Sequence, residues 1–245
     1  MGEDAQKQRA MQLYQEGCTR IENQQFEDAL AYLDKAISLE PTKAMFHFQR
    51  GIGLMNLIRY QDAVDAFETS LKHDSKNPDA WVYNGINYLF MGRYSKAIPC
   101  FDQVLKLEPN HIIALSHKGS CLAELDRHVE AVACFNIILA ENPQDINSLY
   151  NKGISLLKVR SFKGARDAFK KIVRMDNQDY EAWFELGNAL VGMKKYEGAI
   201  KCFDRVIRIE PNHMDAWDVK IKCLRALGMG DEAENLVSKH KTYMW

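Results

Sequence analysis

The sequence predicts an all-α solenoid of helix-turn-helix repeats, and three observations support this prediction. Glycines recur every 34 residues, with alanines and prolines in the same register. Apolar residues within each period follow helical spacing in two separate runs. No insertion interrupts the period, so we expect one continuous array of stacked units rather than independent globular domains.

The period is clearest in its small residues. The glycines spaced by 34 residues are Gly17, Gly51, Gly85, Gly119, Gly153 and Gly187. The alanines in register with them are Ala29, Ala63, Ala97, Ala131, Ala165, Ala199 and Ala233. The sequence therefore predicts seven repeats after a polar tail over residues 1–9. The repeats are 10–43, 44–77, 78–111, 112–145, 146–179, 180–213 and a capping repeat, 214–245.

Each repeat holds two amphipathic helices, A and B. Repeat positions are counted from Ala10, which is position 1 of the first repeat. Large apolar residues tend to fill position 4, glycine tends to fill position 8, and apolar residues again tend to fill position 11. This i, i+4, i+7 spacing marks one face of helix A. Positions 20, 24 and 27 repeat it in helix B, and a proline at position 32, as in Pro109, ends that helix. Glycine at position 8 and alanine at position 20 allow the two helices to approach closely, where a bulky side chain would overpack the seam.

These residues carry a resemblance to the tetratricopeptide repeat family. Its pattern W-x2-L-G-x2-Y…A-x3-F…P appears nearly whole at Trp183, Leu186, Gly187, Leu190, Ala199, Phe203 and Pro211. It recurs at Trp81, Gly85, Tyr88, Ala97, Phe101 and Pro109. The resemblance spans residues 10 to 245 and implies a right-handed superhelix with helices A on its concave side. It indicates the fold strongly and the function weakly, because such folds serve many partners.

The seventh repeat departs from the pattern. Ile221 stands where the others have glycine, and its helix B is polar, with Glu232, Asn235 and Lys239 among its residues. A terminal repeat with a polar outer face is what a solenoid cap requires.

Composition narrows the classes of function. Apolar residues make up 47% and charged residues 27%, and the formal net charge is −1. A near-neutral chain lacks the field that attracts nucleic acid or a membrane surface. The polar N-terminal residues show no secretory signal, no run of apolar residues is long enough to span a bilayer, and the six cysteines form no C-x-x-C pair. We therefore expect a cytoplasmic protein with free thiols.

No motif predicts chemistry. The seven histidines scatter over different repeat positions, and metalloprotease, phosphate-loop and nucleophile-elbow motifs are absent from the sequence. Cysteines recur at shared repeat positions, as Cys100 and Cys202 do, which favours packing over metal binding. The Lys-then-Asn clamp by which some relatives hold chaperone carboxylates is missing, since Phe184 precedes Asn188. We expect no catalysis, no cofactor and no metal.

A partner-binding stripe is predicted on helix A. Positions 5, 9 and 12, which the A–B seam does not use, lie on one helical face and are mostly apolar in repeats one to five. The candidate partner-binding residues are Tyr14, Phe48, Ile52, Met55, Val82, Ile86, Leu89, Phe90, Tyr150, Ile154, Leu157, Phe184, Asn188, Lys222 and Arg225. An apolar peptide or amphipathic helix of another protein would fit this groove, with an acidic end near Asn188, Lys222 and Arg225. Position 12 is equally compatible with core packing between repeats.

Two further features leave alternatives open. Helix B of repeat four is apolar on its outer face at Val129, Ala133, Ile137 and Ala140, which suits self-association or a fixed neighbour in a larger assembly. Repeat five carries a basic run over residues 160–174, which is compatible with RNA but is more typical of a solvated face. The predicted function is an adaptor or scaffold, with a structural subunit as the alternative and an RNA-processing factor as a remote one.

Overall fold

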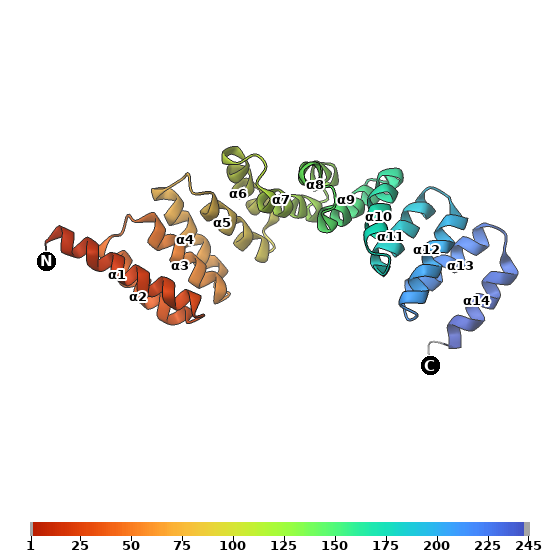
Figure 1. The fold of residues 1–245 in the computed structure, drawn as a ribbon, viewed down its shortest axis with the longest axis horizontal. Helices are drawn as coiled ribbons and strands as arrows, with labels where there is room; N and C mark the ends of the chain where they lie inside the picture. Colours follow the sequence, from red (N-terminus) through yellow and green to blue (C-terminus); the bar gives the residue numbers. More distant parts are fainter. Residues whose placement is uncertain (1, 243–245) are drawn as a thin grey trace. The chain divides into compact units, whose positions relative to one another are not determined.

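The computed structural model describes residues 2–242, which fold into helices without a strand (Figure 1). Helices A of the seven repeats are α1 (Glu3–Glu22), α3 (Ala44–Asn56), α5 (Pro78–Phe90), α7 (Ile112–Glu124), α9 (Ile146–Lys158), α11 (Tyr180–Gly192) and α13 (Met214–Ala226). Helices B are α2 (Phe26–Leu39), α4 (Tyr60–His73), α6 (Tyr94–Leu107), α8 (His128–Glu141), α10 (Phe162–Met175), α12 (Tyr196–Ile209) and α14 (Gly230–Thr242). The predicted all-α helix-pair architecture is confirmed.

The helices group into two compact units, and the single array of repeats over residues 10–245 stays a prediction. The first unit spans Met1–Leu125 and the second Asp126–Trp245, so the division falls between α7 and α8 inside repeat four. Within each unit every helix packs against the next one along the chain.

A glycine–phenylalanine seam holds the A–B pairs of repeats two, three, five and six together, and in the first repeat Leu33 takes the place of the phenylalanine. A Cβ atom built at Gly51 would lie 2.6 Å from Cε1 of Phe67, and one at Gly187 would lie 2.6 Å from Cε1 of Phe203. Both phenylalanines are fully buried. The expected close approach at position 8 is therefore confirmed, and it explains why glycine recurs there. In repeat seven Val237 replaces the phenylalanine, which makes room for Ile221.

The turn between helices A and B contains a residue with a left-handed backbone, at position 15 of each repeat. Gly92 and Gly228 have this conformation, but so do five residues that are not glycine. These are Gln24, Ile58, Asp126, Arg160 and Lys194. In the second repeat the Ile58 amide bonds the Met55 carbonyl and the Arg59 amide bonds the Leu54 carbonyl, which closes the end of α3.

The N-terminal segment differs from the expected polar tail. Helix α1 begins at Glu3, so residues 3–9 extend the first helix. Lys7 forms an ion pair with Glu3 at 2.6 Å, one helical turn apart. The Gln6 side chain also donates a hydrogen bond to the Leu39 carbonyl at 2.9 Å, which ties this turn to the end of α2.

Candidate functional site

The predicted stripe of the first unit is apolar and mostly half-buried. Phe48, Ile52 and Met55 of α3 pack on the core formed by Leu54, Phe67 and their neighbours. Phe48 also contacts Tyr83 of α5 edge-on, with ring centroids 5.8 Å apart. Ile86 and Leu89 are half-buried as well.

Three other members of this set differ in their exposure. Val82 is only 6% exposed, so it belongs mainly to the packing of its unit. Tyr14 of α1 is half-buried, and its ring stacks on Phe46 with centroids 5.1 Å apart. Phe90 is 56% exposed, the largest accessible apolar side chain of the stripe, although its ring also contacts Tyr60. The surface open to a partner is therefore made of partly exposed side chains.

The stripe of the second unit follows the same plan. Tyr150, Ile154 and Leu157 of α9 are half-buried against the core around Phe169. Phe184 of α11 lies between Phe203 and His213, with ring centroids 5.7 and 4.7 Å away. Position 12 thus has the dual character expected for it, since Leu157 and Met55 each contact their core and keep some exposure.

The polar residues expected to receive an acidic ligand have carboxylate neighbours of their own. Asn188 donates to Oε2 of Glu185 at 3.1 Å, and Arg225 pairs with Glu234 at 2.9 Å. Burial raises the pKa of Glu185, and this carboxyl stands beside Asn188 on the same helix. Lys222 is exposed. The suitability of this end for an acidic ligand stays a prediction.

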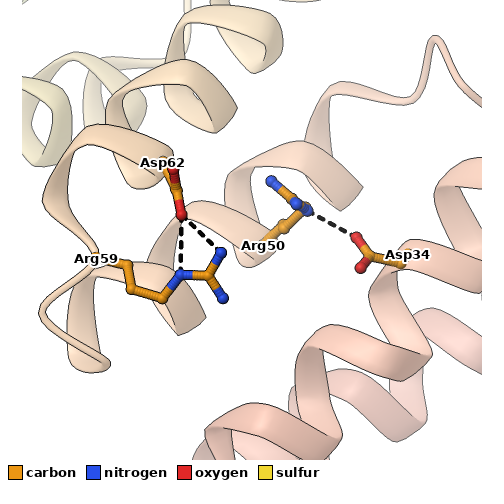
Figure 2. Close-up of polar contacts among 4 residues, drawn as sticks. All are labelled: Asp34, Arg50, Arg59 and Asp62. Carbon is orange, nitrogen blue, oxygen red and sulfur yellow. Dashed lines mark hydrogen bonds and ion pairs between the residues drawn. The ribbon is translucent and has the colours of Figure 1, made fainter.

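A second surface emerges where consecutive repeats meet. Position 7 of helix A faces position 25 of the preceding helix B, and three of these junctions join a cation to a carboxylate. Arg50 of α3 bonds Asp34 of α2 at 2.7 Å (Figure 2). The equivalent pairs are Lys118 with Asp102 and Lys220 with Asp204. The repeat thus contains a recurrent ion pair that links neighbouring repeats.

The junction of repeats two and three lacks this cation. Asn84 occupies position 7 there, opposite Glu68 at position 25. A solvent-accessible cavity of about 560 Å³ lies at this point, lined by residues of α4, α5 and α6 that include both side chains and Trp81. Asn84 is 2% exposed, and its Oδ1 accepts no hydrogen bond.

Glu68 has a neutral donor in place of a cation. The Tyr88 hydroxyl donates to Oε1 of Glu68 at 2.9 Å. Burial, followed by this contact with Glu68, raises the pKa of Tyr88 to about 12, so the phenol stays protonated and donates. Burial raises the pKa of Cys100 in the cavity wall to about 12, which keeps this thiol uncharged and unreactive.

The second unit has a cavity at the same repeat positions, between α10 and α11. Its volume is about 350 Å³. Trp183 corresponds to Trp81, but Leu186 and Leu190 replace the two polar side chains of α5, and Lys170 replaces the glutamate. This cavity is therefore apolar at its floor and basic at its rim.

Comparison with known sequences identifies the repeat. The tetratricopeptide repeat pattern matches residues 14–78 and 84–146, more than half of the chain, and a second pattern of the same description matches residues 180–213. The chain belongs to the tetratricopeptide repeat family. Repeats of this family are generally non-catalytic scaffolds for protein interaction. A comparison with curated proteins finds no match to this tetratricopeptide repeat protein.

Solved tetratricopeptide repeat structures share the fold. MamA from Desulfovibrio magneticus is 23% identical with a TM-score of 0.65, over 70% of this chain and 97% of MamA. YrrB, described as having an unusual peptide-binding site, is 23% identical with a TM-score of 0.57, over 86% of this chain and 91% of YrrB. A repeat protein from Parabacteroides merdae is 17% identical with a TM-score of 0.68, over 96% and 93% of the two chains. At these identities the likeness concerns the fold alone.

Sequence reasoning missed the cavity of this tetratricopeptide repeat protein. The available signal was Asn84, which replaces the leucine of the family pattern W-x2-L-G while Trp81 and Gly85 are kept. A comparison of position 7 of each helix A with position 25 of the preceding helix B would have revealed that the junction of repeats two and three lacks the ion pair. Among the described residues no cluster of three metal-binding side chains occurs, and none of the described helices has the length and hydropathy of a bilayer span.

Proposed function

We propose that this protein is an adaptor whose helix A surface binds an apolar peptide or amphipathic helix of another protein. The observation that supports this most directly is the run of half-buried apolar side chains on α3 and α5 that ends in the exposed ring of Phe90. When a partner helix covers partly exposed aromatic and aliphatic side chains, more of their apolar area is buried at little cost in conformational entropy. We expect the protein to act in the cytoplasm without cofactor or catalysis.

The test is crosslinking of the tagged protein in cells, followed by mass spectrometry of the linked peptides. The adaptor function predicts one dominant foreign protein, with links that map to helices A of repeats two to five. Ile86→Asp combined with Phe90→Asp should reduce this capture at least tenfold, because two anchors of roughly 1.5–3 kcal/mol each are lost. Both side chains keep solvent exposure, so a circular dichroism spectrum should show an unchanged fold.

The second candidate function is a structural subunit that associates with its own copies. The exposure of α8 favours it, since Val129 is 71% and Ile137 41% exposed on one face of this helix. Val129→Asp therefore serves as the matched control in the crosslinking experiment. Links mainly between copies, lost in Val129→Asp and kept in the α5 double variant, would replace the adaptor with the structural subunit.

A further inference from the structure

The cavity between α4, α5 and α6 has mainly apolar walls and contains two polar acceptor side chains, Glu68 and Asn84, that form no ion pair. Each of the three ion-paired junctions places a lysine or arginine of helix A against a carboxylate of the preceding helix B, as Arg50 and Asp34 do (Figure 2). In the cavity the carboxylate is present as Glu68, but the cation is replaced by the shorter, neutral Asn84. This junction therefore keeps the carboxylate acceptor and the space for a cation, but the cation itself is missing.

The acceptors of the cavity lack partners of suitable charge. Glu68 makes no ion pair among the described residues, and its one hydrogen bond comes from the neutral Tyr88 hydroxyl. Oδ1 of Asn84 is buried and unpartnered, a state that costs free energy unless a donor arrives.

The aromatic side chains of the cavity suit a planar cation. Trp81 and Tyr88 both line it, and such rings attract guanidinium groups through their faces. Lys72 and Lys96 also line it, and like Glu68 they are exposed side chains whose charge is screened by salt, so neither fills the position of the missing cation as a buried ion pair would. The Lys96 ammonium already lies 5.8 Å from the centroid of the Tyr88 ring, which shows that a cation is tolerated beside this ring.

We propose that this cavity binds an arginine side chain of a partner protein, whose guanidinium takes the place that Arg50 takes at the preceding junction. A guanidinium carries several donors in one plane, so it can reach the Glu68 carboxylate and the Asn84 carbonyl together. The site uses positions 4, 7 and 11 of α5 together with α4 and α6, whereas the adaptor surface uses positions 5, 9 and 12 of helix A. It would give the protein a specificity for basic segments that the apolar stripe lacks.

The test uses the full chain labelled with ¹⁵N and three blocked pentapeptides, acetyl-Gly-Gly-X-Gly-Gly-amide, where X is arginine, citrulline or glutamate. The arginine peptide should shift the Asn84 side-chain amide and the α5 backbone amides in a saturable manner. The neutral citrulline peptide should bind about tenfold more weakly, because a charged donor is lost. Equal binding of the three peptides, or a preference for glutamate, would overturn the proposal.

Two variants and a control locate the site. Asn84→Arg restores the recurrent ion pair and fills the cavity, so it should abolish binding of the arginine peptide and raise the melting temperature. Glu68→Gln, on an exposed side chain that the fold does not need, should weaken binding about tenfold. Asn56→Arg adds the same charge on exposed α3 and should leave binding unchanged. Binding that survives both cavity variants would place the peptide elsewhere and exclude this site.

Discussion

The cavities of the two units occupy the same positions of the repeat and differ in chemistry. The cavity of the first unit has Asn84 at its floor and Glu68 in its wall, whereas its counterpart in the second unit has Leu186 and Lys170. Each is bordered by a tryptophan at position 4. The two cavities therefore differ in the side chains at positions 7, 11 and 25, and these residues decide what each cavity can bind.

This comparison separates two kinds of constraint on a repeat. Positions 8 and 24, glycine against phenylalanine, set the distance between helices A and B and leave little freedom for substitution. Positions 7 and 25 lie where neighbouring repeats meet, and they hold an ion pair, an unpaired glutamate beside asparagine, or a leucine beside lysine. A repeat protein can therefore vary its recognition at the junctions while its seams stay constant.

The largest effect is expected from exchanging the floors of the two cavities. Leu186→Asn should lower the free energy of unfolding by about 3–4 kcal/mol, because it removes buried apolar volume and adds a polar group without a partner. Asn84→Leu should instead raise it by about 1 kcal/mol, because it removes an unpartnered carbonyl oxygen. Urea denaturation followed by circular dichroism gives both values. If both substitutions changed the free energy of unfolding in the same direction, the different chemistry assigned to Leu186 and Asn84 would be contradicted.

The seam should respond alike in both units. Gly85→Val and Gly187→Val should each lower the free energy of unfolding by about 2–3 kcal/mol, because the new side chain would meet a buried phenylalanine at under 3 Å. Gly198→Ala is the control, since its Cβ would lie 3.4 Å from Leu190, an ordinary contact. Thermal unfolding of the three variants measures the difference. A large effect in only one unit would show that the seams are not equivalent.

The smallest effect is expected at the turns. Ile58 has φ of 61° at the position where Gly92 has φ of 67°, and a β-branched side chain is strained there. Ile58→Gly should raise the free energy of unfolding by about 0.5–1 kcal/mol, and Gly92→Ile should lower it by about 1–2 kcal/mol. Nothing lies within 4 Å of a Cβ at Gly92, so backbone strain alone is measured. Urea denaturation curves that fail to move in opposite directions would argue against strain at Ile58.

Much of the architecture could be predicted from the periodicity. Glycines such as Gly51 and Gly85 recur every 34 residues, and this period predicted stacked helix pairs because the close approach of helices A and B is a local requirement that returns in successive repeats. Helices B begin at position 17, which is aromatic in most repeats, as at Tyr60 and Tyr94. The division into two compact units was not visible, since the period continues through repeat four without interruption.

The candidate site was predictable only in part. The apolar stripe on helix A could be read from positions 5, 9 and 12, but the burial of Val82 and the exposure of Phe90 could not, because both depend on which neighbouring side chains cover them. The left-handed turn at Ile58 was likewise hidden, since glycine occupies that position in only two repeats.

The helix pairs, their order and the small residues of each seam follow from the sequence, because these depend on contacts at fixed separations that recur every 34 residues. The packing of the folded chain was needed to show that Glu68 and Asn84 line one cavity and that Glu68 bonds the Tyr88 hydroxyl there. That outcome depends on side chains from three helices and on the volume they leave empty. A buried carbonyl oxygen without a donor is a property of such packing, which no single segment of the chain specifies.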